Sequence, residues 1–268
     1  MRLNYNGILR QIRYLNYDKV VDSHCHIDTD IYTDTERNDA ITTALDYKIV
    51  MITSPLTRNE RIRALHMQRK YINWIYITIG SHPMLDEPYE HVIDFIYKHE
   101  KEIVGIGEVG LDFAPPMSLE TKKKQIQKFK HFIDLSKTLK KPLIVHSRGA
   151  SRYVLEILMK EDAEKVLLHG FSGNKDIAKI GIEAGYFFSI LPTAIISPKK
   201  KRLIEHIPIE NLLLESDSPA ISPFPNLLSK PWFIFLSAAS IAQIKEINIE
   251  EVIKLSLIHI SEPTRPRL

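Results

Sequence analysis

Short apolar runs rich in β-branched residues recur along the chain and predict eight strands. They lie at 19–24, 48–54, 73–82, 102–112, 142–147, 165–171, 185–190 and 211–218. Between them, apolar residues recur at helical spacing, as in the set Phe129, Phe132, Ile133 and Leu135. Strand and helix therefore alternate along the chain.

Most of these runs are continuously apolar, which is typical of a parallel sheet covered by helices on its outer face. Eight strand–helix units predict an α/β fold, a (β/α)8 TIM barrel formed by a single domain over residues 20–255. An open doubly wound sheet is the alternative, but the phosphate-binding pattern GxGxxG does not follow the first run, and GIGEVG at 105–110 lies inside a strand.

The two ends of the chain do not fit the repeated unit. Residues 1–19 are expected to form a lead-in that covers the bottom of the barrel, and a membrane-surface helix carrying Arg2, Arg10 and Arg13 is the alternative. Residues 256–268 contain two prolines and resemble a translated vector or adapter sequence. We expect them to form an irregular, non-native tail.

Composition narrows the class of protein. With 44% hydrophobic and 26% charged residues among 268, the chain can bury a large core, which excludes intrinsic disorder. A single cysteine, Cys25, excludes a disulfide-stapled secreted domain and favours a cytoplasmic location. The net charge of +3 is too small for a protein that coats nucleic acid. No apolar run is long enough to cross a membrane, and we expect a monomer.

Polar residues with metal-binding side chains stand at the ends of the predicted strands. In a parallel barrel the carboxyl ends of the strands meet on one face and carry the active site. These positions hold His24 and His26, His82, Glu108 and Asp112, His146, His169, and Glu215 and Asp217. We therefore predict that imidazoles and carboxylates from separate strands converge at one rim.

The pair His24 and His26 lies two residues apart on a strand, so both side chains point to the same side and can hold one ion. Together with Glu108, His146, His169 and Asp217 the set is too large for one ion and suits two divalent cations, Mg²⁺, Mn²⁺ or Zn²⁺. A carboxylate can span two ions, so we expect Glu108 to bridge them. Asp217 is expected to join His24 and His26 and to accept a proton from the attacking water, with Glu215 as a supporting carboxylate.

These residues fall in six motifs whose order resembles the TatD-type metal-dependent deoxyribonucleases of the amidohydrolase superfamily. The motifs are VDSHCHID (21–28), GSHP (80–83), GEVGLDF (107–113), VHSR (145–148), LHGFSG (168–173) and ESDSP (215–219). The resemblance implies a TIM barrel with two metals, one held by His24, His26 and Asp217, one by His146 and His169, and both by Glu108. It also implies an exonuclease acting on DNA ends or single strands. Gly170 stands where the family commonly carries cysteine, and the loop after the last motif is shorter than usual.

Other residues have two possible roles each. His82 can act on the scissile phosphate or leaving oxygen, or can orient its neighbours, and Arg148 can bind a phosphate or be an ordinary surface arginine. The runs Lys122–Lys124 and Lys199–Arg202 can attract DNA or simply face solvent, and Phe113 and Phe171 can stack on bases or pack in the core.

The leading functional hypothesis is a two-metal deoxyribonuclease. The alternatives are a hydrolase of small amides, lactones or phosphotriesters with the same metals, because fold and ligands do not determine the substrate, and a non-catalytic binding protein.

Overall fold

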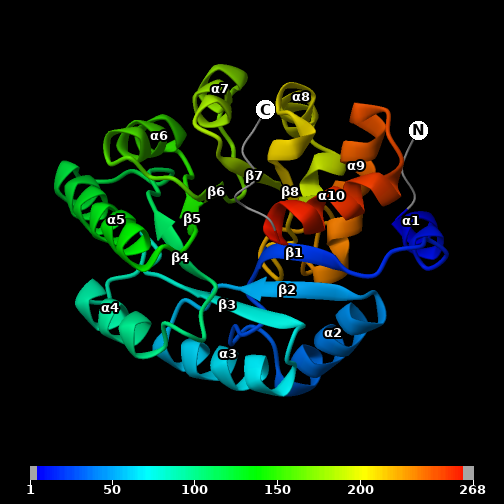
Figure 1. Cartoon of the computed structure of the whole chain (residues 1–268), viewed down its shortest axis with the longest axis horizontal. Coiled ribbons are helices and arrows are strands. Elements are labelled where there is room, and N and C mark those ends of the chain that lie inside the picture. Colours follow the sequence, from blue (N-terminus) through cyan, green and yellow to red (C-terminus); the bar gives the residue numbers. More distant parts are fainter. Residues whose placement is uncertain (1–4, 262–268) are drawn as a thin grey trace.

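A computed structural model describes residues 5–261 and confirms the predicted parallel barrel (Figure 1). The eight strands are hydrogen-bonded in the order of the sequence, each parallel to the next. Each strand coincides with one of the predicted apolar runs. They are β1 (Val20–Cys25), β2 (Ile49–Thr53), β3 (Ile75–Ile79), β4 (Gly105–Gly110), β5 (Leu143–His146), β6 (Val166–Leu168), β7 (Phe187–Ile190) and β8 (Leu212–Leu214).

Helices cover the outside of the barrel, and most of them follow a strand (Figure 1). They are α2 (Asp34–Asp46), α3 (Arg58–Lys70), α4 (Tyr89–Lys98), α5 (Leu119–Leu139), α6 (Ser151–Lys160), α7 (Lys175–Glu183), α8 (Pro198–His206) and α9 (Ile234–Lys245). Short 3₁₀ turns η1 (Pro192–Ile195), η2 (Ile209–Asn211) and η3 (Pro231–Phe233) lie in the connections. Capping boxes start α2 and α3, through Thr33 with Glu36 and Thr57 with Glu60, so these helices begin at defined residues close to the strand ends.

The barrel closes between its last and first strands through polar contacts around Asp22. This buried carboxylate accepts hydrogen bonds from the Ser216 backbone N–H (2.8 Å) and hydroxyl (2.5 Å). The Asp217 N–H donates to the His24 carbonyl at 3.0 Å, and the His26 N–H donates to the Ser218 carbonyl at 2.7 Å. The loop after β8 is therefore fastened beside the two histidines of β1.

Glycines in β4 allow this strand to lie close to β5. A Cβ on Gly107 would meet the Ile144 Cβ at 2.6 Å, and Gly110 has φ +133° with its α-carbon facing the His146 carbonyl oxygen. Gly107 and Gly110 therefore permit a close approach of the two backbones on either side of Glu108. Glu108 and His146 project from neighbouring strands as a result.

The predicted irregular tail is wrong for residues 256–261. Helix α10 (Ile249–Ser261) continues through this segment, packs on α9, β1 and β8, and buries Val252, Ile253 and Ser256. Burial of this apolar face favours helix over the irregular form that the local sequence indicated. Residues 262–268 lie outside the described part of the chain. At the other end, α1 (Tyr5–Ile12) packs against α9 and buries Ile12.

Candidate active site

The strand ends bring the six predicted metal-binding side chains together in one place. They come from β1 (His24 and, just beyond it, His26), β4 (Glu108), β5 (His146) and the residues following β6 (His169) and β8 (Asp217). All six are buried or nearly so, with His146 the most accessible at 15%. Five widely separated segments of the sequence thus contribute to one buried polar cluster.

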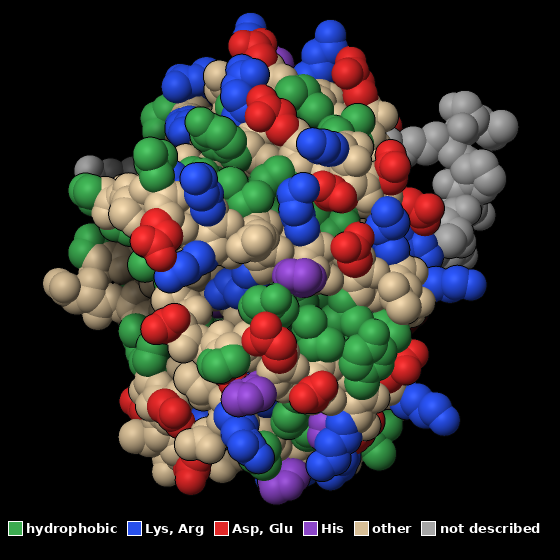
Figure 2. Space-filling view, turned by 90° about the vertical axis from the view of Figure 1, so that its left-hand side faces the viewer, with side chains coloured by type: hydrophobic (Ala, Val, Ile, Leu, Met, Phe, Trp, Pro, Cys, Tyr) green, Lys and Arg blue, Asp and Glu red, His purple; other side chains and the backbone are tan. Residues whose placement is uncertain are grey.

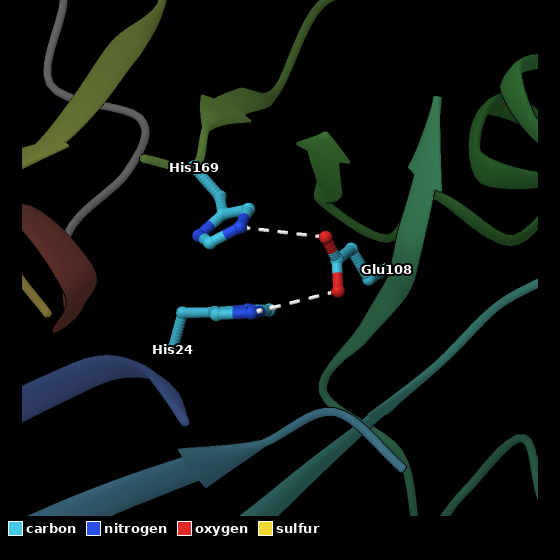
Figure 3. Close-up of side chains that lie close together, drawn as sticks. All are labelled: His24, Glu108 and His169. Carbon is cyan, nitrogen blue, oxygen red and sulfur yellow. Dashed lines mark ion pairs between the residues drawn. The ribbon is translucent and has the colours of Figure 1, made fainter. Parts of the chain in front are cut away.

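Glu108 lies at the centre, and Figure 3 shows one of its carboxylate oxygens facing His24 and the other facing His169. Oε2 lies 3.7 Å from Nε2 of His24 and 3.7 Å from Nε2 of His26. Oε1 lies 2.7 Å from Nδ1 of His146 and 3.4 Å from Nε2 of His169. The carboxylate therefore separates the four histidines into two pairs.

Asp217 lies beside the pair formed by His24 and His26. Its Oδ1 lies 3.8 Å from Nε2 of His24 and 3.5 Å from Nε2 of His26, so these atoms and Oε2 of Glu108 surround a small space. Nε2 of His24 is buried and has no hydrogen-bond partner. A buried polar atom without a partner is costly, which indicates that a cation belongs there.

Neighbouring groups orient three of the imidazoles toward the two carboxylate oxygens of Glu108. The Ser54 carbonyl accepts from Nδ1 of His26 at 2.8 Å, and the Ser54 hydroxyl lies 3.2 Å from Nδ1 of His24. Glu215 accepts from Nδ1 of His169 at 2.9 Å. These contacts leave the Nε2 atoms of the three rings free to bind an ion. The supporting role predicted for Glu215 agrees with this placement, whereas Ser54 was not predicted although it ends the second apolar run.

The electrostatics of the cluster follow from burial and from its carboxylates. Burial lowers the pKa of His24 well below its usual value. Burial alone would also lower the pKa of His26, but the neighbouring Asp217 raises it to about 9. Glu215 and Glu108 likewise raise the pKa of His169 against the effect of burial. For Glu108 the surrounding histidines outweigh burial and hold its pKa well below the usual value.

His82 lies at the edge of the cluster. Its Nδ1 accepts the Met84 backbone N–H at 3.2 Å, which leaves the proton on Nε2, 3.8 Å from Oε1 of Glu108. Burial lowers the pKa of His82 to about 4, so the ring is neutral at pH 7. Nζ of Lys128 on α5 donates to the His82 carbonyl at 2.9 Å and holds the loop in place.

Asp112 connects the cluster to Arg148. Its Oδ2 lies 3.0 Å from Nε2 of His146 and accepts from Nε of Arg148 at 2.9 Å. Burial alone would raise the pKa of Asp112, but the hydrogen bond from Arg148 keeps it below its usual value. The Arg148 side chain is 60% exposed, so it stands at the mouth of the site with its guanidinium fixed on one side. Asp112 was recognised as a strand-end residue, but its link between these two side chains was not predicted.

The remaining candidates are the aromatic and basic residues that could contact DNA. Phe171 is 2% exposed and packs edge to face on Phe188, so the core role is correct for it. Phe113 is only partly buried and follows the end of β4. On the outer face over α4–α6, positive and negative side chains are interspersed, so this face is not a broad basic patch (Figure 2).

Comparison with known proteins places these features in a family. The profile of the family described as TatD related DNase matches residues 21–258. The chain belongs to the TatD-related DNase family. It is therefore an enzyme of the metal-dependent hydrolase kind, and the predicted family resemblance is confirmed.

Named relatives of TatD type cover most of the chain. It is 35% identical over 251 residues to human deoxyribonuclease TATDN3, covering 88% of this chain and 91% of that protein. It is 34% identical over 238 residues to an uncharacterized metal-dependent hydrolase of Methanocaldococcus jannaschii, covering 87% and 92%. The crystal structure of a TatD homolog from Escherichia coli, YJJV, shares the fold with a TM-score of 0.80 at 21% identity, covering 91% and 97%. Within the described residues, no helix is long and apolar enough to cross a membrane.

Proposed function

We propose that this TatD-family hydrolase binds two divalent cations at the cluster and cleaves phosphodiester bonds at the ends of DNA or in single strands. The observation that supports two ions is the position of Glu108, whose two oxygens each face a separate pair of histidines. A carboxylate can serve two ions at once in this way, one through each oxygen. His24, His26 and Asp217 would hold the first ion with Glu108, and His146 and His169 the second.

The spacing of the donor atoms fits a cation. Donors bound at ~2.1 Å in tetrahedral geometry lie about 3.4 Å from one another. In the first group, Nε2 of His24 and of His26 lie 3.5–3.8 Å from the oxygens of Asp217 and Glu108. Mixed nitrogen and oxygen donors suit Zn²⁺ and Mn²⁺ better than an all-oxygen site would. A cation also gives the buried Nε2 of His24 its missing partner.

The bound cations would lower the pKa of water and neutralise charge on the phosphate, which together supply most of the rate enhancement. The chain's own residues then have distinct tasks. Asp217 accepts the proton of the attacking water, because its carboxylate lies at the first group and 7% of its side chain is exposed. His82 is neutral and keeps its proton on Nε2, so it donates a hydrogen bond to a phosphate oxygen. Arg148, fixed by Asp112, binds the phosphate with its exposed edge.

DNA as substrate is supported by the family and by the printed name of the human relative, a deoxyribonuclease. The site itself supports a phosphodiester, because it sets a hydrogen-bond donor and a fixed guanidinium beside the cluster. Backbone recognition of this kind suits a nuclease that acts without regard to base sequence.

The decisive experiment uses protein stripped of metal by a chelator. It is given a single-stranded oligodeoxynucleotide, alone or with Mg²⁺, Mn²⁺ or Zn²⁺, beside a panel of simple esters, amides and lactones. We expect nucleotide release only from DNA with added metal, with two equivalents of metal bound per chain at full activity. Ester, lactone or amide turnover without DNA cleavage would show instead that the enzyme acts on small molecules. Maximal activity with one equivalent would refute the two-ion arrangement.

A further inference from the structure

A group of side chains at the mouth of the site combines exposed aromatic surface with positive charge. We call Phe113, Tyr153, Lys122 and Arg148 the aromatic lip. Phe113 follows β4, Arg148 follows β5, and Lys122 and Tyr153 lie in the first turns of α5 and α6. The Phe113 and Tyr153 rings pack edge to face, 5.6 Å apart at 66°, and Nζ of Lys122 lies 5.1 Å from the centre of the Phe113 ring. Four segments thus build one small surface.

The aromatic lip is joined directly to the cluster that carries the chemistry. Arg148 donates to Asp112 through Nε (2.9 Å), and its NH2 nitrogen lies 2.8 Å from the same carboxylate. Asp112 in turn contacts His146, whose other ring nitrogen faces Glu108. The Phe113 backbone N–H also donates to the Arg148 carbonyl at 2.8 Å. A substrate held at the lip is therefore held in a fixed position relative to the reacting centre.

The exposure of Tyr153 distinguishes the lip from ordinary core packing. The Tyr153 side chain is 55% exposed although one edge of it contacts Phe113. A single exposed aromatic residue on a surface needs no special explanation. Here, however, the exposed ring contacts Phe113, and Phe113 in turn lies beside the Lys122 ammonium and is hydrogen-bonded through its backbone to Arg148 at the site. Aromatic faces beside positive charge are what proteins use to hold unpaired bases, by stacking, together with the phosphates between them.

This combination selects one form of DNA. A base can offer its face to a protein ring only when it is not stacked between neighbours in a duplex. We propose that the aromatic lip binds the unpaired base next to the scissile phosphodiester, with Tyr153 stacking on the base, Lys122 contacting a flanking phosphate and Arg148 contacting the scissile phosphate. The proposal rests on the proposed nuclease function and adds the requirement for an unpaired base at one position.

Three variants test the role of the ring. Tyr153→Leu keeps an apolar side chain but removes the aromatic face, and Tyr153→Trp keeps it. Tyr97→Leu is the matched control, because Tyr97 on α4 is 51% exposed and lies away from the lip. We expect Tyr153→Leu to raise the KM for a single-stranded oligodeoxynucleotide about tenfold with kcat unchanged, and the other two variants to behave like the wild type.

Abasic substrates then locate the base that stacks. A series of oligodeoxynucleotides carries one tetrahydrofuran residue at successive positions from the cleaved end. At one position of the abasic residue we expect the KM of the wild-type enzyme to rise to that of Tyr153→Leu, so that the two enzymes have equal KM values for that substrate. A KM increase of the same size in Tyr97→Leu would refute the proposal. A difference in KM between the wild type and Tyr153→Leu that persists with every abasic substrate would also refute it.

Failure of the nuclease function itself has a different signature. In that case the wild-type enzyme cleaves no DNA with any of the three metals, and the aromatic lip is tested by binding alone. Fluorescence anisotropy with the same oligonucleotides would support it if Tyr153→Leu weakened binding of the intact strand but not of one abasic strand. Equal affinities of the two proteins for every strand would exclude it.

Discussion

The carboxylate of Glu215 offers a sharp test of how the cluster is organised, because it is fully buried and never faces the ion positions. Oε2 accepts hydrogen bonds from Nδ1 of His169 (2.9 Å) and the Ser189 hydroxyl (2.6 Å), and Oε1 accepts from the Gly170 N–H (2.8 Å). All three neighbours are donors toward it. The variant Glu215→Gln keeps the shape but replaces one accepting oxygen by an NH₂ group.

Neither orientation of the new amide satisfies its neighbours. If its nitrogen takes the place of Oε1, it faces the Gly170 N–H, and two donors meet. If it takes the place of Oε2, His169 must accept through Nδ1, which puts the proton on Nε2, the atom that faces Glu108. The first outcome leaves a buried donor unsatisfied and should lower the free energy of unfolding by about 1–3 kcal/mol. The second removes a metal ligand and should weaken metal binding by about 10–100-fold.

Two measurements separate these effects. Urea unfolding of the metal-free protein, followed by circular dichroism, gives the stability, and competition with a fluorescent chelator gives the Zn²⁺ affinity. Glu215 also raises the pKa of His169, so its loss reduces competition from protons. The loss of affinity should therefore become larger as the pH increases. Glu205→Gln on α8, an exposed glutamate, is the control. Wild-type metal affinity of Glu215→Gln at every pH, together with an unchanged free energy of unfolding, would refute the role assigned to this carboxylate.

Three further predictions concern the cluster and its surroundings. Glu108→Ala should reduce bound metal from two equivalents to one or none and lower kcat by at least about 100-fold, because both sets of metal-binding side chains lose the carboxylate that they share. Atomic emission measures the bound metal and DNA cleavage measures kcat. Two retained ions would contradict the bridging role. Lys128→Met removes the ammonium that binds the His82 carbonyl and should lower kcat about tenfold with metal content unchanged. Lys128→Arg should recover part of the loss. Identical rates for Lys128→Met and the wild type would show that this contact does not position the loop. Metal affinity should rise with pH up to about pH 9, by about tenfold per unit, because His26 holds a proton below its raised pKa of about 9 and a cation must displace it. The same raised pKa stabilises the metal-free folded state at pH values below the pKa of His26 in the unfolded chain, and this stabilisation is lost as the pH rises through about 9. Chelator competition and urea unfolding at several pH values measure the two effects. A metal affinity independent of pH would contradict the assignment.

The strands and the order of the site residues were accessible from the sequence because both depend on local patterns. Apolar runs predict strands, and a polar residue that ends such a run projects at the carboxyl rim of a parallel barrel. The convergence of His24, Glu108, His169 and their neighbours follows from this rule. The prediction of an irregular tail is wrong for 256–261, because α10 packs on α9, β1 and β8 and buries Ile253 and Ser256 there. That burial depends on the surface the helix packs against and not on its own sequence.

The pairing of the side chains depends on how the strands are packed in the barrel. The period of a strand determines which face a side chain occupies but not the offset between neighbouring strands, and that offset decides which atom meets which. For this reason the contacts of Asp112 with Arg148, of Ser54 with the β1 histidines and of Asp22 across the seam could not be predicted. The barrel and the residue types at its rim can be read from the amino-acid sequence alone, because both follow from local periodicity. The direction of each ligand atom depends on distances between segments far apart in the chain, which only the packed barrel determines.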